Sequence, residues 1–431
     1  MTRQRGMIAP GTAVALAIAI FVAAVCQVAC RAEASAQATR DSAGIRIVDN
    51  ARPADGSRLP WRVGAGPAVS IGEVVGEEAY LLHRANDATI LPDGRIVIAN
   101  TGSSELRVFD AAGVHLATWG REGEGPGEFT SLAGVEPWPG DSVVAWNNRT
   151  WVISVFDAEG ALGRSFTLDS EAGALEPRAV QAIRGHYPRQ RRDSEAGALE
   201  PRAVLHDGSI LGRTGEVTGD GYRRSQETYE LRPSYGGSPV GFGTHPGQES
   251  HIGYEGGIAL MGLLPFGRSL WEAEWGELVI LTTDDNYEVR AYDPSTGALA
   301  RIVRREYENR APTREEVDEA LEAALERAGL TGPSLKMTRR GYGSMPIVEQ
   351  YPAFNNLLTD PLDHLWVREA TLPGIDRPAP LWTVFDPEGR ALGFIETPDG
   401  VTVYEIGADY LLGLATDEMG VESVQLWELE R

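Results

Sequence analysis

Residues 88–100 read ATILPDGRIVIAN, and residues 106–113 read LRVFDAAG. In the first stretch Pro-Asp-Gly separates two apolar strands, and in the second an alternating strand runs into an aromatic-Asp-x-x-Gly turn. Short alternating strands that are separated by turns of this composition predict antiparallel hairpins. Together the two stretches predict one antiparallel unit of four strands.

Both hairpins recur along the chain, and this repetition predicts the fold. The second signature returns in ISVFDAEG at 153–160, VRAYDPSTG at 289–297 and WTVFDPEG at 382–389, with weaker copies at 229–237 and at the C-terminus. Counterparts of the first hairpin lie at 135–146, 203–213, 270–282, 357–369 and 404–415. Repeated four-stranded antiparallel units are typical of propeller blades. The sequence therefore predicts an all-β fold, a six-bladed β-propeller over residues 41–431.

Closure of the ring is a physical requirement, because an open ring leaves unpaired strand edges. The last unit ends at Leu429 after three strands, and residues 45–48 (IRIV) form an alternating strand without a unit of its own. We therefore predict that residues 45–48 complete the sixth blade and close the ring.

Two insertions interrupt the repeat. The stretch DSEAGALEPRAV occurs at 169–180 and again at 193–204, so residues 169–192 are predicted to be a tandem-duplicated insertion. A second insertion, over 306–345, contains a predicted helix at about 313–329. Thr313 and Glu316 match a capping box at its start, and Val317, Leu321 and Leu325 share one face, which is expected to pack on the ring.

The first 38 residues predict export. Arg3 and Arg5 precede an uncharged run over residues 6–30, which is the layout of a secretory signal, with cleavage expected after Ala36 or Ala38. Cys30 is a lipidation candidate if the segment is a lipoprotein signal, and an uncleaved anchor helix is a third interpretation. The expected location is periplasmic, extracellular or lipid-anchored at the cell envelope.

The charge of the chain limits its partners. There are 62 acidic and 39 basic residues, for a formal net charge of −23. Because nucleic-acid binding needs a basic face, this balance argues against nucleic acid, and it also disfavours anionic membrane surfaces. Membrane contact is expected only through an N-terminal lipid or anchor. The expected partner is a small ligand or an envelope protein.

Residues 120–160 carry a resemblance to a known repeat. They read GREGEGPGEFTSLAGVEPWPGDSVVAWNNRTWVISVFDAEG. This resembles the NHL-repeat pattern, in which G-x-G-P-G-x-F precedes a Gly-Val strand, a turn and a strand that ends in aromatic-x-x-x-Gly. Similar chains are exported six-bladed propellers of NHL or TolB-like type. The resemblance implies a fold and not a reaction.

Propellers of the gluconolactonase and paraoxonase types, which the units also resemble in blade number, hold a calcium ion in the central channel. Their ligands are Asp, Glu and Asn side chains on innermost strands. When the first hairpins of the six units are aligned on their turns, one level holds the candidate ligand-binding residues Asn86, Asp87, Glu200, Arg268, Asn355 and Asn356. The oxygen donors suit calcium, whereas a positive charge on Arg268 would repel it.

Motifs of other enzyme classes do not appear in the sequence. The seven histidines form no H-E-x-x-H pair, and there is no G-x-S-x-G. The sequence therefore predicts no catalytic residues and no required cofactor. Its leading interpretation is an exported propeller that binds a ligand or a protein without catalysis. The alternative is a calcium-dependent, lactonase-like hydrolase that uses the channel acids.

Overall fold

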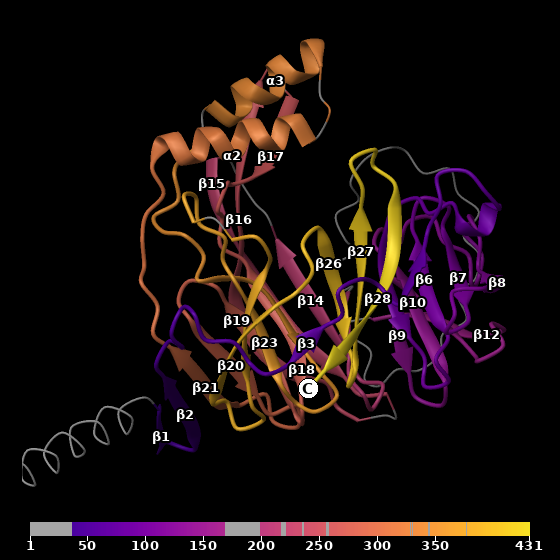
Figure 1. The fold of residues 1–431 in the computed structure, drawn as a ribbon, viewed down its shortest axis with the longest axis horizontal. Helices are drawn as coiled ribbons and strands as arrows, with labels where there is room; N and C mark the ends of the chain where they lie inside the picture. Colours follow the sequence, from indigo (N-terminus) through magenta and orange to yellow (C-terminus); the bar gives the residue numbers. More distant parts are fainter. Residues whose placement is uncertain are drawn as a thin grey trace, which may run out of the picture.

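The computed structural model describes residues 37–168, 199–216, 221–234, 237–255, 258–327, 329, 331–343, 345–375 and 377–431. In these residues the strands form six sheets that follow one another along the chain (Figure 1). Residues 1–36 of the predicted export segment, which include Cys30, and the predicted duplication at 169–192 lie outside the described residues. No helix in the described part of the chain is long and apolar enough to cross a membrane.

The first three sheets, named blades 1 to 3, are antiparallel meanders. Blade 1 contains β5 (Ala85–Ile90), β6 (Ile96–Asn100), β7 (Glu105–Phe109) and β8 (His115–Trp119). Blade 2 contains β9 (Leu132–Trp138), β10 (Ser142–Asn147), β11 (Val152–Phe156) and β12 (Leu162–Thr167). Blade 3 contains β13 (Glu200–Val204), β14 (Ile210–Glu216), β15 (Gly221–Arg232), β16 (Val240–Glu255) and β17 (Ile258–Leu263).

Blades 4 to 6 repeat the same order of strands. Blade 4 contains β18 (Leu270–Trp275), β19 (Leu278–Thr283), β20 (Glu288–Tyr292) and β21 (Leu299–Arg305). Blade 5 contains β22 (Phe354–Thr359), β23 (Leu365–Glu369), β24 (Leu381–Phe385) and β25 (Ala391–Glu396). Blade 6 contains β26 (Val401–Ile406), β27 (Tyr410–Thr416) and β28 (Glu422–Glu430).

The repeated aromatic-Asp-x-x-Gly signature forms the turn between the last two strands of a blade. In blade 1 the Asp110 carboxylate accepts the N–H groups of Ala112 (2.9 Å) and Val114 (2.8 Å). Gly113 has a φ of +80°, a conformation that glycine adopts without the strain a side chain would add. Asp157 and Asp386 make the same pair of bonds in blades 2 and 5. Local turn chemistry therefore accounts for the regular spacing of the strands.

The six blades close into a ring. The innermost strands β5, β9, β13, β18, β22 and β26 each contact the next, and β26 and β27 contact β5. Apolar side chains fill every interface between blades; Val97, Val135 and Val143, for example, pack together between blades 1 and 2. The fold is a β-propeller, as predicted, and its core is divided among the blade interfaces.

Strands from the N-terminal part of the chain close the last blade, although they are not the predicted residues. β4 (Val69–Ile71) pairs with β28, with Ile71 opposite Val424, and β3 (Arg62–Val63) pairs with the end of β28. The prediction for residues 45–48 is wrong: β2 (Ile45–Asn50) pairs in parallel with β21 of blade 4. Alternation marks residues 45–48 as a half-buried strand but does not indicate which sheet edge they join.

Blade 4 is extended at its outer edge, and a short helix precedes blade 1. β1 (Gln37–Ser42) pairs with β2, so the sheet of blade 4 has six strands. The 3₁₀ helix η1 (Glu78–Tyr80) lies between β4 and β5. The chain thus adds its first described strands to the rim of blade 4 before it reaches the closing strand.

The second insertion contains two helices where the sequence predicted one. α2 (Arg314–Arg327) begins with the predicted capping box, in which the Glu316 carboxylate accepts the Thr313 N–H (2.7 Å) and the Thr313 hydroxyl accepts the Glu316 N–H (3.2 Å). Its predicted apolar residues Val317, Leu321 and Leu325 are buried. The additional helix, α3 (Gly332–Gly343), contacts β16 and β17 of blade 3.

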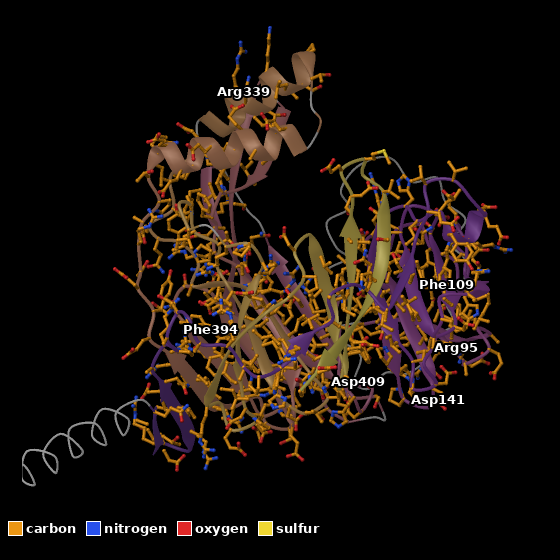
Figure 2. The ribbon with its side chains drawn as sticks, viewed as in Figure 1. Arg95, Phe109, Asp141, Arg339, Phe394 and Asp409 are labelled. Carbon is orange, nitrogen blue, oxygen red and sulfur yellow. The ribbon has the colours of Figure 1, made fainter. Side chains whose placement is uncertain are left out.

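The helices stand beyond the ring, on the long strands of blade 3 (Figure 1). Arg339 on α3 forms an ion pair with Glu322 on α2, and Figure 2 shows Arg339 at this outer position. β15 and β16, of 12 and 16 residues, support them. The insertion therefore rises from one end of the propeller.

Candidate functional site at the channel mouth

The six predicted ligand-binding residues lie at the beginnings of innermost strands. Asn86 and Asp87 are on β5, Glu200 begins β13, and Asn355 and Asn356 are on β22. Arg268 lies two residues before β18. Because the innermost strands run in the same direction around the ring, their beginnings meet at one mouth of the central channel. Asn86 is exposed and has no side-chain hydrogen bond in the described part of the structure.

Asp87 links blade 1 to blade 2. One carboxylate oxygen accepts the N–H of Val135 on β9 (3.0 Å), and the other accepts the N–H of Ala88 (2.9 Å). Loss of water around the carboxyl raises the pKa of Asp87 to about 7, with a smaller contribution from the negative charge of Glu405. Both oxygens are therefore engaged by main-chain donors.

Two further acids, which the sequence alignment of the hairpins missed, make the same kind of link. The Glu405 carboxylate accepts the Thr89 hydroxyl (2.6 Å) and the Ile90 N–H (3.2 Å), joining blade 6 to blade 1. Glu136 accepts the Val204 N–H (3.2 Å), joining blade 2 to blade 3. The only sequence signal for either acid is its position in an otherwise apolar innermost strand. We call Asp87, Glu136 and Glu405 the channel carboxyls.

The channel carboxyls also influence one another electrostatically. Burial, together with the negative charges of Asp87, Glu274 and Glu405, raises the pKa of Glu136 to about 8. Burial likewise raises the pKa of Glu405. Several carboxylates close together in a poorly hydrated channel repel one another, which favours the protonated forms. Asp87 and Glu136 therefore titrate close to neutral pH.

Glu200 belongs to a chain of ion pairs. Arg213 contacts it at 2.5 Å and Arg202 at 3.1 Å. Arg213 also pairs with Glu227 (3.0 Å), and Arg202 pairs with Glu272 on β18. Two guanidinium groups thus surround Glu200, and their positive charge opposes the approach of a cation.

Arg268 is similarly engaged. The Arg268 guanidinium pairs with Glu249 and with Asp285 (3.2 Å). The main-chain N–H of Arg268 also donates a hydrogen bond to the Glu249 carboxylate (2.8 Å). Arg224 makes a second ion pair with Asp285 (2.7 Å). Burial alone would raise the pKa of Glu249. The hydrogen bonds from Arg268 outweigh this effect and hold that pKa below its ordinary value. Arg268 therefore has partners within the chain.

Blade 5 differs from this paired side of the mouth. The register of β22 shifts between Phe354 and Asn356, which makes Asn355 the bulged residue, and the side-chain oxygen of Asn355 is buried without a hydrogen-bond partner. Asn356 lies opposite Arg368 on β23, whose Nε is also buried without a partner. Burial lowers the pKa of Arg368 below its usual value. Sequence reasoning did not select Arg368.

The residues at the mouth do not fit a calcium site. Within the described ranges, no three His, Cys, Asp or Glu side chains are grouped so that they could hold a metal ion. Asp87 is bound to main-chain N–H groups and Glu200 to two arginines. Calcium needs six to eight oxygen ligands, and the acids at this mouth face other partners.

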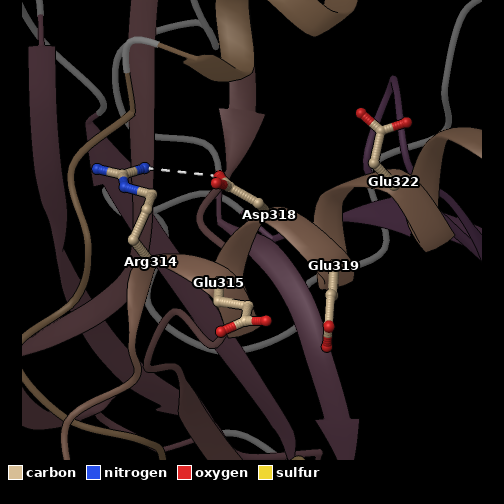
Figure 3. Close-up of a pocket in the computed structure, with 5 residues that line it drawn as sticks. All are labelled: Arg314, Glu315, Asp318, Glu319 and Glu322. Atoms are coloured by element: carbon tan, nitrogen blue, oxygen red, sulfur yellow. Dashed lines mark ion pairs between the residues drawn. The ribbon is translucent and has the colours of Figure 1, made fainter.

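A shallow pocket lies away from the channel, on the outer surface of α2. Its walls are acidic apart from one arginine, and they come entirely from this helix (Figure 3): Arg314, Glu315, Asp318, Glu319 and Glu322. Arg314 forms an ion pair with Asp318 at 3.9 Å. The pocket contains none of the predicted residues.

Comparisons with known proteins leave the family open. No family model matches the chain, and no curated protein matches it. Among solved structures, a candidate exported protein from Bacteroides fragilis is similar at 11% identity and a TM-score of 0.47, covering 89% of this chain and 99% of its own. A DUF4221 family member from Bacteroides vulgatus has 10% identity and a TM-score of 0.41, covering 86% and 99%. A gluconolactonase from Xanthomonas campestris has 13% identity and a TM-score of 0.37, covering 90% and 100%.

Proposed function

We propose that this chain is an exported β-propeller that binds a ligand at the channel mouth where its innermost strands begin, without catalysing a reaction. The sequence of the first 38 residues supports export. The mouth supports binding, because Arg368 lies there partly exposed, opposite Asn356, and no carboxylate of the described residues pairs with it. This observation carries the proposal, since a partly desolvated charge without a counter-charge is stabilised by an anionic partner.

Two of the channel carboxyls, Asp87 and Glu405, are poorly placed for catalysis. A general base needs a lone pair within hydrogen-bond reach of the proton that it removes. The oxygens of Asp87 that could serve accept the N–H groups of Val135 and Ala88, and Glu405 accepts a hydroxyl and an N–H from blade 1. The bonds from Val135, Thr89 and Ile90 join neighbouring blades, so we assign Asp87 and Glu405 to the structure of the ring.

Ligand screening tests binding against catalysis. The purified protein is screened by thermal denaturation against small polar metabolites, and a ligand that binds the folded state raises Tm by an amount that grows with the ratio of its concentration to its Kd. Each compound that raises Tm is then incubated with the protein and followed by NMR. We expect the compound to remain unchanged. Conversion of the compound to a product would overturn the proposal.

Calcium titration addresses the hydrolase alternative directly. We expect isothermal titration calorimetry with calcium chloride to show no saturable heat, and EDTA to leave Tm unchanged. Saturable binding that is lost in Asp87→Asn and retained in the exposed control Asp141→Asn would favour the calcium-dependent hydrolase over the proposal.

A further inference from the structure

We infer that blades 6, 1, 2 and 3 form a pH-sensitive arc of the ring, which opens locally when the channel carboxyls Asp87, Glu136 and Glu405 lose their protons. The inference concerns the ring itself and does not rest on the proposed function. It requires only protons and water to enter the channel. The position of the three carboxyls and the groups that they contact carry it.

The channel carboxyls lie at three successive junctions between blades. At each junction an acid on one innermost strand accepts a main-chain N–H from the innermost strand of the next blade: Glu405 from Ile90 (3.2 Å), Asp87 from Val135 (3.0 Å) and Glu136 from Val204 (3.2 Å). All three bonds run in the same direction around the ring. The strand bound at one junction carries the carboxyl of the next, so a movement at one junction is passed along the arc.

The channel carboxyls have no positively charged partner. Within the described ranges, no arginine, lysine or histidine pairs with any of the three. The side chains that donate to them are hydroxyl groups, those of Thr89 (2.6 Å) and Tyr410, and both donate to Glu405. A negative charge on these acids is therefore not compensated by any of the contacts that hold the junctions together.

The titratable groups that face the channel carboxyls are other acids and a tyrosine. Glu405 acts on Asp87, and Asp87, Glu405 and Glu274 on β18 act on Glu136. Tyr404 on β26 lies close enough to Asp87 for the two to interact. Because a charge gained by one carboxyl raises the free energy of the others, we expect the three to titrate together.

The junction between blades 3 and 4 is built differently. There Glu272 on β18 pairs with Arg202 on β13. Glu274 accepts the main-chain N–H of His206 (2.9 Å) and also contacts the His206 ring. The guanidinium of Arg202 stays charged at every pH at which the protein is folded, so it compensates the charge of Glu272 throughout. The pH response is therefore expected in the arc and not at this junction.

Ionisation favours opening because an open junction hydrates its carboxylate. In the closed ring the pKa is about 7 for Asp87 and about 8 for Glu136, and water that enters an opened junction returns each pKa toward its ordinary value. The N–H bonds from Val135 and Ala88 act in the opposite direction and only reduce the shift at Asp87. Each group therefore increases the open fraction by up to about tenfold per pH unit, until it is ionised in the closed ring as well.

Hydrogen exchange measured by mass spectrometry tests the inference. The reporters are peptides with the amides of Ile90, Val135 and Val204, because each of these N–H groups is donated to a channel carboxyl. Between about pH 6 and 8.5, after correction for the intrinsic effect of pH on exchange, their exchange should increase at least about tenfold. Blade 5, whose buried Glu369 pairs with Arg305, is the internal reference and should change less than about twofold.

Variants assign the response to the carboxyls. Glu136→Gln keeps an acceptor for the Val204 N–H but cannot ionise, so the Val204 reporter should lose most of its dependence on pH. Glu405→Gln should do the same for the Ile90 reporter and serves as the second test if the first variant fails to fold. Asp141→Asn, exposed in the turn after β9, is the control and should respond as the unaltered protein does. Circular dichroism and Tm at pH 6 establish that each variant folds.

Three outcomes would each overturn the inference. The reporters could respond no more than blade 5 does, all six blades could respond equally, which is global unfolding, or the response could persist unchanged in Glu136→Gln and Glu405→Gln. None of these outcomes bears on whether a ligand binds at the mouth. Turnover of a ligand, which would overturn the proposed function, leaves the pH-sensitive arc untouched.

Discussion

Adjacent charged residues on the two faces of β23, Glu369 and Arg368, differ in whether the fold gives them partners. Toward blade 4, Glu369 accepts hydrogen bonds from Arg305 (2.6 Å), Tyr287 (2.9 Å) and Thr383 (2.8 Å), and all four side chains are buried. Toward blade 6, Arg368 shares its face with tryptophans, and no acid of the described residues pairs with it. Among these residues the acid of β23 therefore has hydrogen-bond partners in the fold, whereas the adjacent arginine has no counter-charge.

The largest effect is expected on the blade 4 face. Glu369→Ala leaves the Arg305 guanidinium buried and unpaired, which should lower the free energy of unfolding by about 3–5 kcal/mol. Urea denaturation measures it. Glu369→Gln, which keeps part of the hydrogen bonding, should cost less than Glu369→Ala. A loss within error of zero for Glu369→Ala would remove the contrast between the two faces.

A second change tests whether the paired side of the mouth is tightly built. Gly247 lies beside the Glu227 carboxylate and the Ser225 hydroxyl, and a Cβ at this position would overlap both. Gly247→Ala should therefore lower the free energy of unfolding by about 1–3 kcal/mol. Gly241→Ala is the control, because a Cβ there meets nothing. Equal stabilities of the two variants would show that the network of Glu227 tolerates displacement.

The channel carboxyl Asp87 is expected to make the stability of the protein depend on pH. The pKa of Asp87 is raised to about 7 in the folded state and returns to its ordinary value on unfolding. Between about pH 4 and 7 the folded state therefore holds a proton that the unfolded state has released, and stability falls by up to about 1.4 kcal/mol per pH unit for this group. Above pH 7 Asp87 is ionised in both the folded and the unfolded state, and the stability that its protonation gives at lower pH is fully lost.

Asp87→Asn keeps an acceptor for the Val135 N–H but cannot ionise. Its stability should fall less steeply than that of the unaltered protein between pH 4 and 7, as measured by urea denaturation at several pH values. The exposed control Asp141→Asn (Figure 2) should follow the unaltered protein throughout. Parallel curves for Asp87→Asn would mean that this carboxyl is ionised in the folded protein across the range.

The smallest effect is expected on the blade 6 face. Arg368→Met removes a charge that has no partner and keeps most of the apolar stem, so the free energy of unfolding should change by less than about 0.5 kcal/mol or increase. Comparison with Glu369→Ala in the same denaturation series makes the contrast quantitative. A loss above about 2 kcal/mol would identify Arg368 as structural.

The sequence predicted the features that depend on local chemistry. Asp110 and Gly113 form a turn whose bonds span four residues, so the repeated signature is readable without knowledge of the fold. The capping box of Thr313 and Glu316 is local in the same sense. The closing strand was missed because β4 has three residues, too few to show alternation.

The sequence predicted where the candidate residues lie on their strands, and their role in binding stays a prediction. Aligning the hairpins on their turns placed Asp87, Glu200 and Asn355 near the beginnings of innermost strands, because each unit begins its innermost strand in the same way. The links from Glu136 to Val204 and from Glu405 to Thr89 join blades, and no local pattern records them. Arg368 is distinguished by an absent partner, which becomes visible only once the neighbouring chain is in place.

The pairing of β4 with β28 has a consequence for the order of folding. Val69–Ile71 precedes all six blades in the sequence, whereas its partner residues 424–426 lie in the last strand of blade 6. Gly72, with a φ of +145°, lies against the Glu422 carbonyl oxygen, so the junction accepts no side chain at that point. The ring can therefore close only after β28 has been synthesised, and contacts this distant along the chain fold slowly. Deletion of residues 422–431, which contain β28, should leave the strands of blades 1 to 5 unchanged in sequence and still prevent the propeller from closing.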